Sequence, residues 1–274
     1  MRNRLLSACL IATITTASEA AETPATLAPV TEVARFSAEE ARQGVVADGK
    51  YVYAISNAEI GKYDRATHKR VDTWQGDPAR FRHMNSCILA GKELVCAASN
   101  YPEVPQASSI EWFDAVHLAH VRTRSLGPGR GSLTWLDWHD GSWWACFANY
   151  DGKGGEPNRD HRYTTLVRYG TDFQEQGAWL FPATVLERFG TFSSSGGVWG
   201  EDGLLYVTGH DRPELYALRV PPAGSTLEHV ATIPLVTDGQ AVAWERGADR
   251  ILWGIERKTK EAVAAHVPPV TTGK

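Results

Sequence analysis

The stretch "SSSGGVWGEDGLLYVTGHDRPELYALRV", residues 193–220, decides the fold. It reads as a strand, a tight turn at Asp202-Gly203, a second strand, a polar corner at 209–213 and a third strand. Apolar and β-branched runs separated by Gly-containing turns are typical of antiparallel hairpins. The corner itself, "GHDRP", fits neither a buried core nor an ordinary turn. Its role becomes clear only from the other hairpins of the chain.

The same hairpin recurs five times along the sequence. Each copy begins with small or polar residues, runs through an apolar strand, turns, and returns through a β-branched or aromatic strand. The copies occupy 44–57, 85–100, 131–149, 195–210 and 239–257. A third strand follows every copy, and a fourth strand follows the first four copies. Four antiparallel strands per unit predict an all-β fold, a five-bladed β-propeller.

The isolated strand at 31–37 resembles the fourth strands, so we expect it to complete the last blade from the other end of the chain. A six-bladed ring is the alternative. It needs another repeat between the third and fourth copies, where Pro182 and Gly190 instead delimit a short predicted helix. A β-sandwich is the competing fold, but it does not explain why Trp135, Trp199 and Trp244 recur at similar places in first strands. We expect these three to pack between blades.

The N-terminus differs from the rest of the chain. Basic residues at 2–4, an apolar run at 5–15 and small residues up to Ala20 predict a secretory signal peptide over 1–20. A buried N-terminal helix is the alternative. We expect a flexible lead-in over 21–30, a single propeller domain over 31–270, and a secreted or periplasmic protein.

Two cysteines oppose each other across the second hairpin. A two-residue turn at Gly91-Lys92 pairs Cys87 with Cys96, and directly opposed residues lie within disulfide range. An oxidising compartment makes this disulfide feasible. The alternative is three small buried thiols, and Cys146 stays unpaired in both cases.

Composition and charge restrict the classes of partner. The chain has 274 residues, 43% of them hydrophobic, and a formal net charge of −4. This charge gives no basic field for nucleic acid. No apolar run approaches the roughly 20 residues that a membrane-spanning helix needs. We expect a monomer whose partner is a small molecule or a glycan.

The propeller gives the polar corner its place. Residues before each first strand and after each second strand meet around one axial mouth, and in this chain they are polar. Imidazole titrates near working pH and Arg binds carboxylates bidentately. The candidate catalytic residues are His83, His210 and Asp211, and the candidate substrate-binding residues are Asn85, Ser132, Ser195, Gln240, Arg212 and Tyr101. Because Asn and Asp also end strands by bonding nearby backbone groups, a purely structural role is the alternative.

Oxygen-bearing side chains at the same corners suit a hard cation. The candidate metal ligands are Asn57, Asn100, Asn149 and Glu256, and the cofactor that they would hold is Ca²⁺ or another divalent cation. With its Asn-rich corners, the chain resembles the gluconolactonase and paraoxonase group of propellers. That resemblance implies an axial divalent ion that polarises a lactone or ester carbonyl, although the group is six-bladed and five blades are counted here. The five-bladed secreted glutaminyl cyclases are a looser analogy.

The sequence therefore favours a metal-assisted hydrolase, lactonase or cyclase acting on a small polar molecule. The alternative is a non-catalytic binding propeller for a small molecule, glycan or peptide. A five-bladed glycosidase is disfavoured because first strands begin with Gly, Asn and Ser rather than with opposed carboxylates. A serine hydrolase is disfavoured because no Gly-x-Ser-x-Gly elbow is present.

Overall fold

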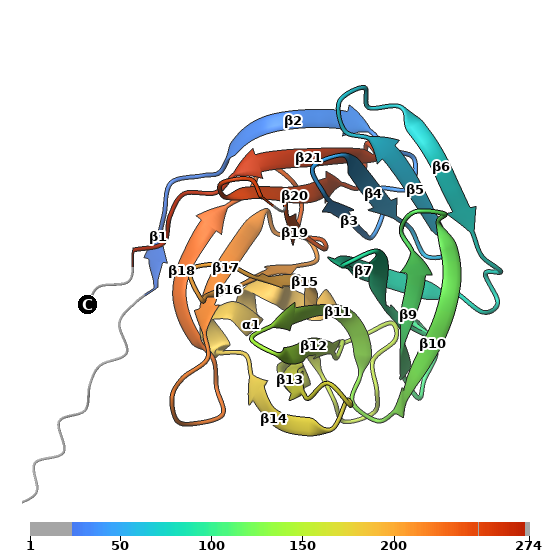
Figure 1. Ribbon diagram of the computed structural model, residues 1–274. Helices are drawn as coiled ribbons and strands as arrows, with labels where there is room; N and C mark the ends of the chain where they lie inside the picture. Colours follow the sequence, from blue (N-terminus) through green and yellow to red (C-terminus); the bar gives the residue numbers. More distant parts are fainter. Residues whose placement is uncertain (1–23, 246, 272–274) are drawn as a thin grey trace, which may run out of the picture.

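The computed structural model describes residues 24–245 and 247–271, which form five antiparallel sheets around a central axis (Figure 1). The five-bladed prediction is confirmed. Blade 1 comprises, from the axis outward, β3 (Gly44–Ala47), β4 (Tyr51–Ile55), β5 (Glu59–Asp64) and β6 (Arg70–Gln75). Blade 2 comprises, in the same order, β7 (His83–Ala90), β8 (Glu93–Ser99), β9 (Ala107–Asp114) and β10 (Ala119–Pro128). Blade 3 comprises, again from the axis outward, β11 (Ser132–His139), β12 (Ser142–Ala148), β13 (Thr165–Tyr169) and β14 (Glu175–Leu180). Blade 4 comprises β15 (Ser194–Trp199), β16 (Leu205–Gly209), β17 (Glu214–Arg219) and β18 (Glu228–Pro234).

Blade 5 is built from both ends of the described chain. It comprises β19 (Ala243–Trp244), β20 (Ile251–Glu256), β21 (Glu261–His266) and, outermost, β2 (Thr31–Ser37). β2 pairs antiparallel with β21, from Thr31 opposite His266 to Ser37 opposite Glu261. The predicted closure of the last blade by the strand at 31–37 is therefore confirmed, and Figure 1 shows β2 lying along the outside of β21.

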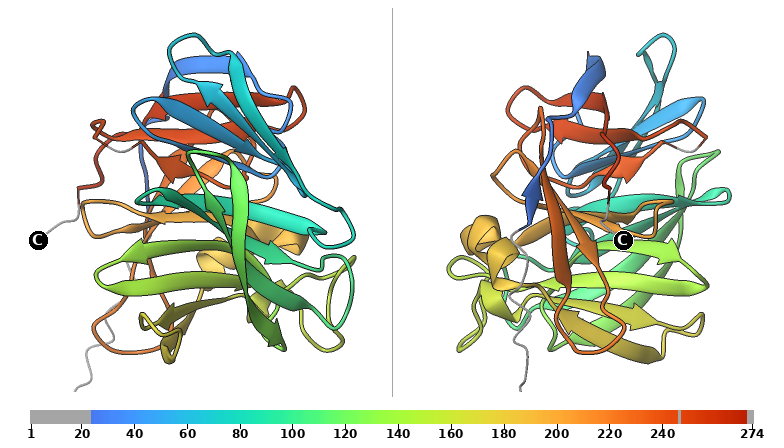
Figure 2. Two further views of the ribbon diagram at one scale, coloured as in Figure 1. Left: turned by 45° about the vertical axis from the view of Figure 1, so that its right-hand side comes forward. Right: turned by 90° about the vertical axis from the view of Figure 1, so that its left-hand side faces the viewer.

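The segment before β2 is more ordered than the sequence predicted. Instead of a flexible lead-in, residues 24–30 contain β1 (Ala25–Thr26), which pairs in parallel with β18 as a fifth strand on blade 4 (Figure 2). The backbone amides of Leu27 and Val30 continue the pairing by donating to carbonyls of Thr232 and Pro234. Apolar Val30 is buried, which explains why the segment adheres. The predicted signal peptide, 1–20, lies outside the described residues.

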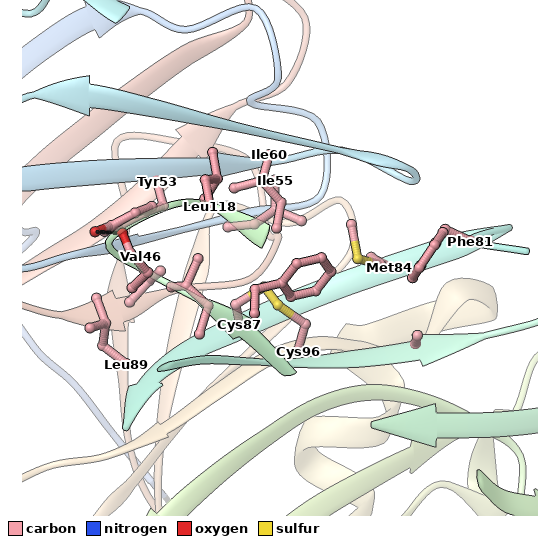
Figure 3. Packing of buried hydrophobic residues seen from close by; sticks show 14 of the residues in the cluster. Val46, Tyr53, Ile55, Ile60, Phe81, Met84, Cys87, Leu89, Cys96 and Leu118 are labelled. Atoms are coloured by element: carbon pink, nitrogen blue, oxygen red, sulfur yellow. Dashed lines mark hydrogen bonds between the residues drawn. A yellow bond between two sulfur atoms is a disulfide. The ribbon is translucent and has the colours of Figure 1, made fainter. Parts of the chain in front are cut away.

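The hydrophobic core is divided among the five blade interfaces. Side chains alternate along a strand, so each sheet presents one apolar face to the preceding blade and one to the following blade. Five buried clusters result, one for each pair of neighbouring blades. The cluster between blades 1 and 2 contains the Cys87–Cys96 disulfide, which joins β7 to β8 across the hairpin (Figure 3). The alternative of three free thiols is wrong, and Cys146 is the free, buried one.

The recurrent tryptophans pack between blades, as predicted, but not at equivalent positions. Trp135 is fully buried in the middle of β11, and its Nε1 donates to Ser194 of blade 4. Trp199 and Trp244 stand at the ends of their strands; Trp199 stacks on His139 of blade 3, with ring centroids 4.3 Å apart. The regularity in the sequence thus reflects a shared need to fill interfaces.

Helical structure is scarce and lies next to the mouth. The predicted short helix is confirmed as α1 (Ala183–Phe189), which ends at Gly190 in the left-handed region and continues into the 3₁₀ turn η2 (Gly190–Phe192). A second 3₁₀ turn, η1 (His161–Tyr163), lies in the long loop of blade 3. No helix in the described ranges has the length and apolar character required to cross a membrane.

Candidate functional site

A cavity of about 330 Å³ opens at the axial mouth, where the loops before the first strands and after the second strands converge. Its lining combines cations, imidazoles, aromatic rings and neutral polar groups, contributed by all five blades or their connecting loops. The lining residues are Gln43, His83, Asn85, Tyr101, Thr134, Tyr150, Lys153, Phe192, Ser195, His210 and Arg257.

Three irregular inner strands form the floor of this cavity. β7, β11 and β15 each depart from regular register near their first residues, around Asn85, at Thr134 and at Ser195. A bulge re-aims the side chain of the extra residue, so these three polar groups line the cavity at the top of the axial channel. Asn85 Nδ2 donates to Leu133 O over 3.0 Å and so links β7 to β11.

Close backbone contact narrows the channel at the level of the floor. A Cβ atom added to Gly196 would lie 2.6 Å from the carbonyl oxygen of Gln240, and one added to Gly44 would lie 2.6 Å from Ala241 Cβ. The absence of side chains at these two glycines lets the inner strands of blades 4, 5 and 1 approach one another. The cavity is therefore a cup at the mouth with a narrow base.

His83 is a neutral imidazole held by the side chains of two asparagines, Asn57 and Asn85. Its Nδ1 lies 3.0 Å from Asn57 Oδ1, which also accepts from Gln43 Nε2. Because that amide oxygen only accepts, Nδ1 carries the proton and Nε2 is left as an acceptor. Burial, assisted by the charge of Arg257 and by His210, lowers the pKa of His83 to about 4.

His210 links a carboxylate to an arginine. Its Nε2 lies 2.9 Å from Arg257 Nη1, and its Nδ1 lies 2.6 Å from Asp211 Oδ1. Arg257 can only donate, so Nε2 accepts and the Nδ1–H donates to Asp211. Gln240 holds the same corner from below by donating to the backbone oxygen of His210. This chain of contacts orients the Arg257 guanidinium at the mouth.

Two cations in the lining lack an anionic partner. Arg257 and Lys153 form no ion pair with any residue in the described ranges, and none of the eleven lining residues is a carboxylate. Because the lining contains two cationic side chains and no carboxylate, it carries a net positive charge. Such a field favours an anionic ligand over a cationic or zwitterionic one.

Aromatic rings form one side of the cavity. Tyr101 follows β8 and meets Tyr150 edge to face, with centroids 5.3 Å apart, while it also packs on His83 at 4.9 Å. Phe192, on η2, packs on His210 at 4.7 Å and is 37% exposed. The wall therefore offers apolar ring faces above a polar floor.

The structure brings together five of the predicted catalytic and substrate-binding residues. His83, His210, Asn85, Ser195 and Tyr101 all line the cavity. The other four are outside the lining: Asp211 supports His210, Gln240 supports the same corner, Ser132 is buried against Ser99, and Arg212 is exposed at the corner. Their proposed catalytic or binding roles remain predictions.

The predicted metal ligands do not line the cavity, and most are occupied by local hydrogen bonds. Asn57 Oδ1 accepts from His83 and Gln43, and Asn100 bonds the backbone of Pro105 and Ala107 at its own corner. Asn149 donates to Arg130 and Tyr163, leaving one buried oxygen without a partner, and Glu256 accepts from the backbone of Lys258. These contacts match the structural alternative for strand-ending residues.

A divalent cation does not fit this arrangement. The guanidinium of Arg257 and the ammonium of Lys153 line the place where an axial ion would sit, and the predicted ligands are dispersed around it. Within the part of the chain that the structure describes, the one cluster with metal-ligand geometry is Asp151, Asp160 and His161 in the blade 3 loop. Its members bond one another and Arg162. Calcium remains a prediction of the sequence.

Several lining residues were not selected from the sequence as ligand-binding residues. Lys153 lies in the long connection between β12 and β13, and Phe192 lies in the helix-containing connection between β14 and β15. Long connections often serve binding. Arg257 follows the last second strand, next to Glu256, and was visible as part of that corner. Thr134 carries no signal in the sequence, because only the bulge between Leu133 and Trp135 turns it toward the cavity.

Comparison with known proteins finds only distant structural similarity. No protein-family model matches the chain, and no curated protein matches its sequence. Among solved structures, the Cps50 (Swd1) β-propeller domain of Myceliophteria thermophila is similar with a TM-score of 0.48 and 10% identity, over 88% of this chain and 100% of that one. The hydrazine synthase of Kuenenia stuttgartiensis is similar with a TM-score of 0.47 and 13% identity, over 81% of this chain and 70% of that one. The WD40 repeats of RRP9 are similar with a TM-score of 0.45 and 12% identity, over 81% of this chain and 78% of that one. The five-bladed fold of this chain follows from its own sheet topology.

Proposed function

We propose that this protein is a non-catalytic binding propeller whose axial cavity takes a small anionic molecule. The observation that carries the proposal is the pair of cations, Arg257 and Lys153, that form no ion pair in the described ranges and stand in a lining without a carboxylate. A guanidinium held in place by His210 can bind a carboxylate or phosphate through two parallel hydrogen bonds. The aromatic wall would cover the apolar part of the same ligand.

The two histidines support binding over catalysis. His210 Nε2 is occupied by Arg257, so it has no free lone pair with which to accept a proton from substrate. His83 has a pKa of about 4, which makes it a weak general base near neutral pH. A hydrolase or lactonase of the gluconolactonase and paraoxonase type is the second candidate, and the feature that favours it is the neutral imidazole of His83 in the cavity lining.

We also propose a secreted or periplasmic location. The signal-like sequence at 1–20 supports it, as does the Cys87–Cys96 disulfide, because disulfides persist in oxidising compartments.

Isothermal titration calorimetry with three anions, benzoate, D-glucuronate and inorganic phosphate, tests the proposed function. At least one should bind, and Arg257→Gln should weaken that binding by about 10- to 100-fold, the worth of a charged hydrogen bond. Arg219→Gln is the matched control, because Arg219 ends β17 and pairs with Glu228 away from the mouth. Equal binding by wild type and Arg257→Gln, or no binding at all, overturns the proposal. Hydrolysis of ester or lactone probes that is lost in His83→Gln would establish the hydrolase instead.

A further inference from the structure

The cavity is layered, and the layers differ in chemistry. Exposed Arg257 and Lys153 supply charge at the rim, whereas the floor consists of neutral donors and acceptors, among them Asn85, Thr134 and Ser195. A ligand that satisfies both layers carries its negative charge at one end and neutral polar groups at the other. This second requirement goes beyond a preference for anions.

The floor has hydrogen-bonding capacity to spare. Ser195 is half-buried, and its hydroxyl bonds to no residue in the described ranges. Thr134 Oγ1 is fully buried, with the Cys146 thiol as its neighbour, so it is closed to a ligand. Because Ser195 lines the cavity, a ligand group that both donates and accepts hydrogen bonds can pair with its hydroxyl. Ligand hydroxyls have this property.

Charge at the deep end of the ligand is disfavoured. The floor contains no acidic residue that could hold an ammonium group, so a zwitterionic amino acid leaves its cation unpaired. It also contains no lysine or arginine for a second anion, and His83 stays neutral above its low pKa. The ligand class that remains carries one anionic group and several hydroxyls.

The aromatic wall and the size of the cup favour a single sugar ring. Tyr101 and Phe192 place apolar ring atoms in the lining, against which the C–H face of a pyranose can pack while its hydroxyls bind the floor. A cavity of about 330 Å³ is at the small end of ligand pockets and holds one such ring. We therefore propose that the axial site binds an acidic monosaccharide of the hexuronate class, with its carboxylate on Arg257 and its hydroxyls on the floor. This inference rests on the proposed function.

Calorimetry with three matched probes separates this inference from the proposed function. D-Glucuronate should bind at least tenfold more tightly than D-glucose, which lacks the carboxylate, and than benzoate, which lacks the hydroxyls. Ser195→Ala should weaken glucuronate binding by about fivefold, the worth of one neutral hydrogen bond, and leave benzoate binding unchanged. Ser125→Ala, on the outer strand β10, is the control for the mutation itself.

Each outcome decides one of the two proposals. If benzoate binds as tightly as glucuronate and Ser195→Ala affects neither, the anion site stands and the sugar acid is wrong. If no anion binds, both proposals fail. Free hexuronate and the end residue of an acidic glycan share this chemistry, so a tetragalacturonate is the last probe. Tighter binding than galacturonate monomer assigns the site to a glycan end, and equal binding assigns it to the free sugar acid.

Discussion

Replacing His83 with glutamine should flatten the dependence of stability on acid. In the folded protein, burial and the neighbouring Arg257 lower the pKa of His83 from 6.5 to about 4. Between these two values the unfolded chain binds a proton that the folded chain does not. The stability contributed by the neutral imidazole is thus complete above pH 6.5 and is lost as pH falls to 4.

The magnitude follows from the width of that window. Each unit of pKa difference corresponds to about 1.4 kcal/mol, so acidification from pH 7 to pH 4 should remove about 3 kcal/mol through this side chain. Glutamine keeps an amide that can donate to Asn57 but does not titrate. His83→Gln should therefore lose about 3 kcal/mol less than wild type over the same range.

Urea denaturation at pH 7, 5.5 and 4 provides the measurement. The free energy of unfolding in water is compared at each pH among wild type, His83→Gln and a His266→Gln control at the end of β21. The histidines other than His83 and His266 are present in all three proteins. Identical pH slopes for wild type and His83→Gln would refute the argument that His83 is held neutral at the mouth.

Three further changes test the fold that supports the site. Gly196→Ala places a methyl group 2.6 Å from the backbone of Gln240 and should cost about 1–3 kcal/mol in denaturant melts; an unchanged midpoint would show that the channel is wider than described. The double variant Cys87→Ser, Cys96→Ser frees a hairpin of nine-residue separation and should lose about 2–3 kcal/mol under non-reducing conditions, and reduction should affect wild type alone. Deleting 24–30 removes β1 and should lower the melting temperature while leaving ligand affinity intact; loss of binding would show that this segment shapes the mouth.

The strands could be predicted from the sequence because each hairpin contains its own turn residues and its own alternation of apolar and polar residues. The fourth strand at 70–75 and the closing strand at 31–37 appear in the structure with the bounds predicted from the sequence. The segment at 24–30 was missed because its parallel pairing with β18 depends on a partner about 200 residues away. No local pattern of residues encodes that contact.

The residues of the site could be predicted only in part, because strand ends can be located from the sequence but side-chain directions at irregular strands cannot. Position relative to a strand end placed His83 and His210 at the mouth, because topology alone brings those ends together. Side-chain direction at an irregular strand start cannot be derived from alternation, so Thr134 was missed and Ser132 was selected instead. The asparagines were read as metal ligands because the same oxygens suit both cations and backbone amides.

The pairing of β2 with β21 also sets the order in which the ring can form. Arg35 on β2 bonds Glu261 on β21 across a sequence separation of 226 residues. β2 is synthesised before every other strand except β1, yet its partner β21 follows the strands of the other four blades. Until then the first four blades can assemble, but the fifth lacks its outer strand and the N-terminal strand has an unpaired edge. Contacts this distant in sequence are slow to form, so we expect ring closure to be the last and rate-limiting step of folding.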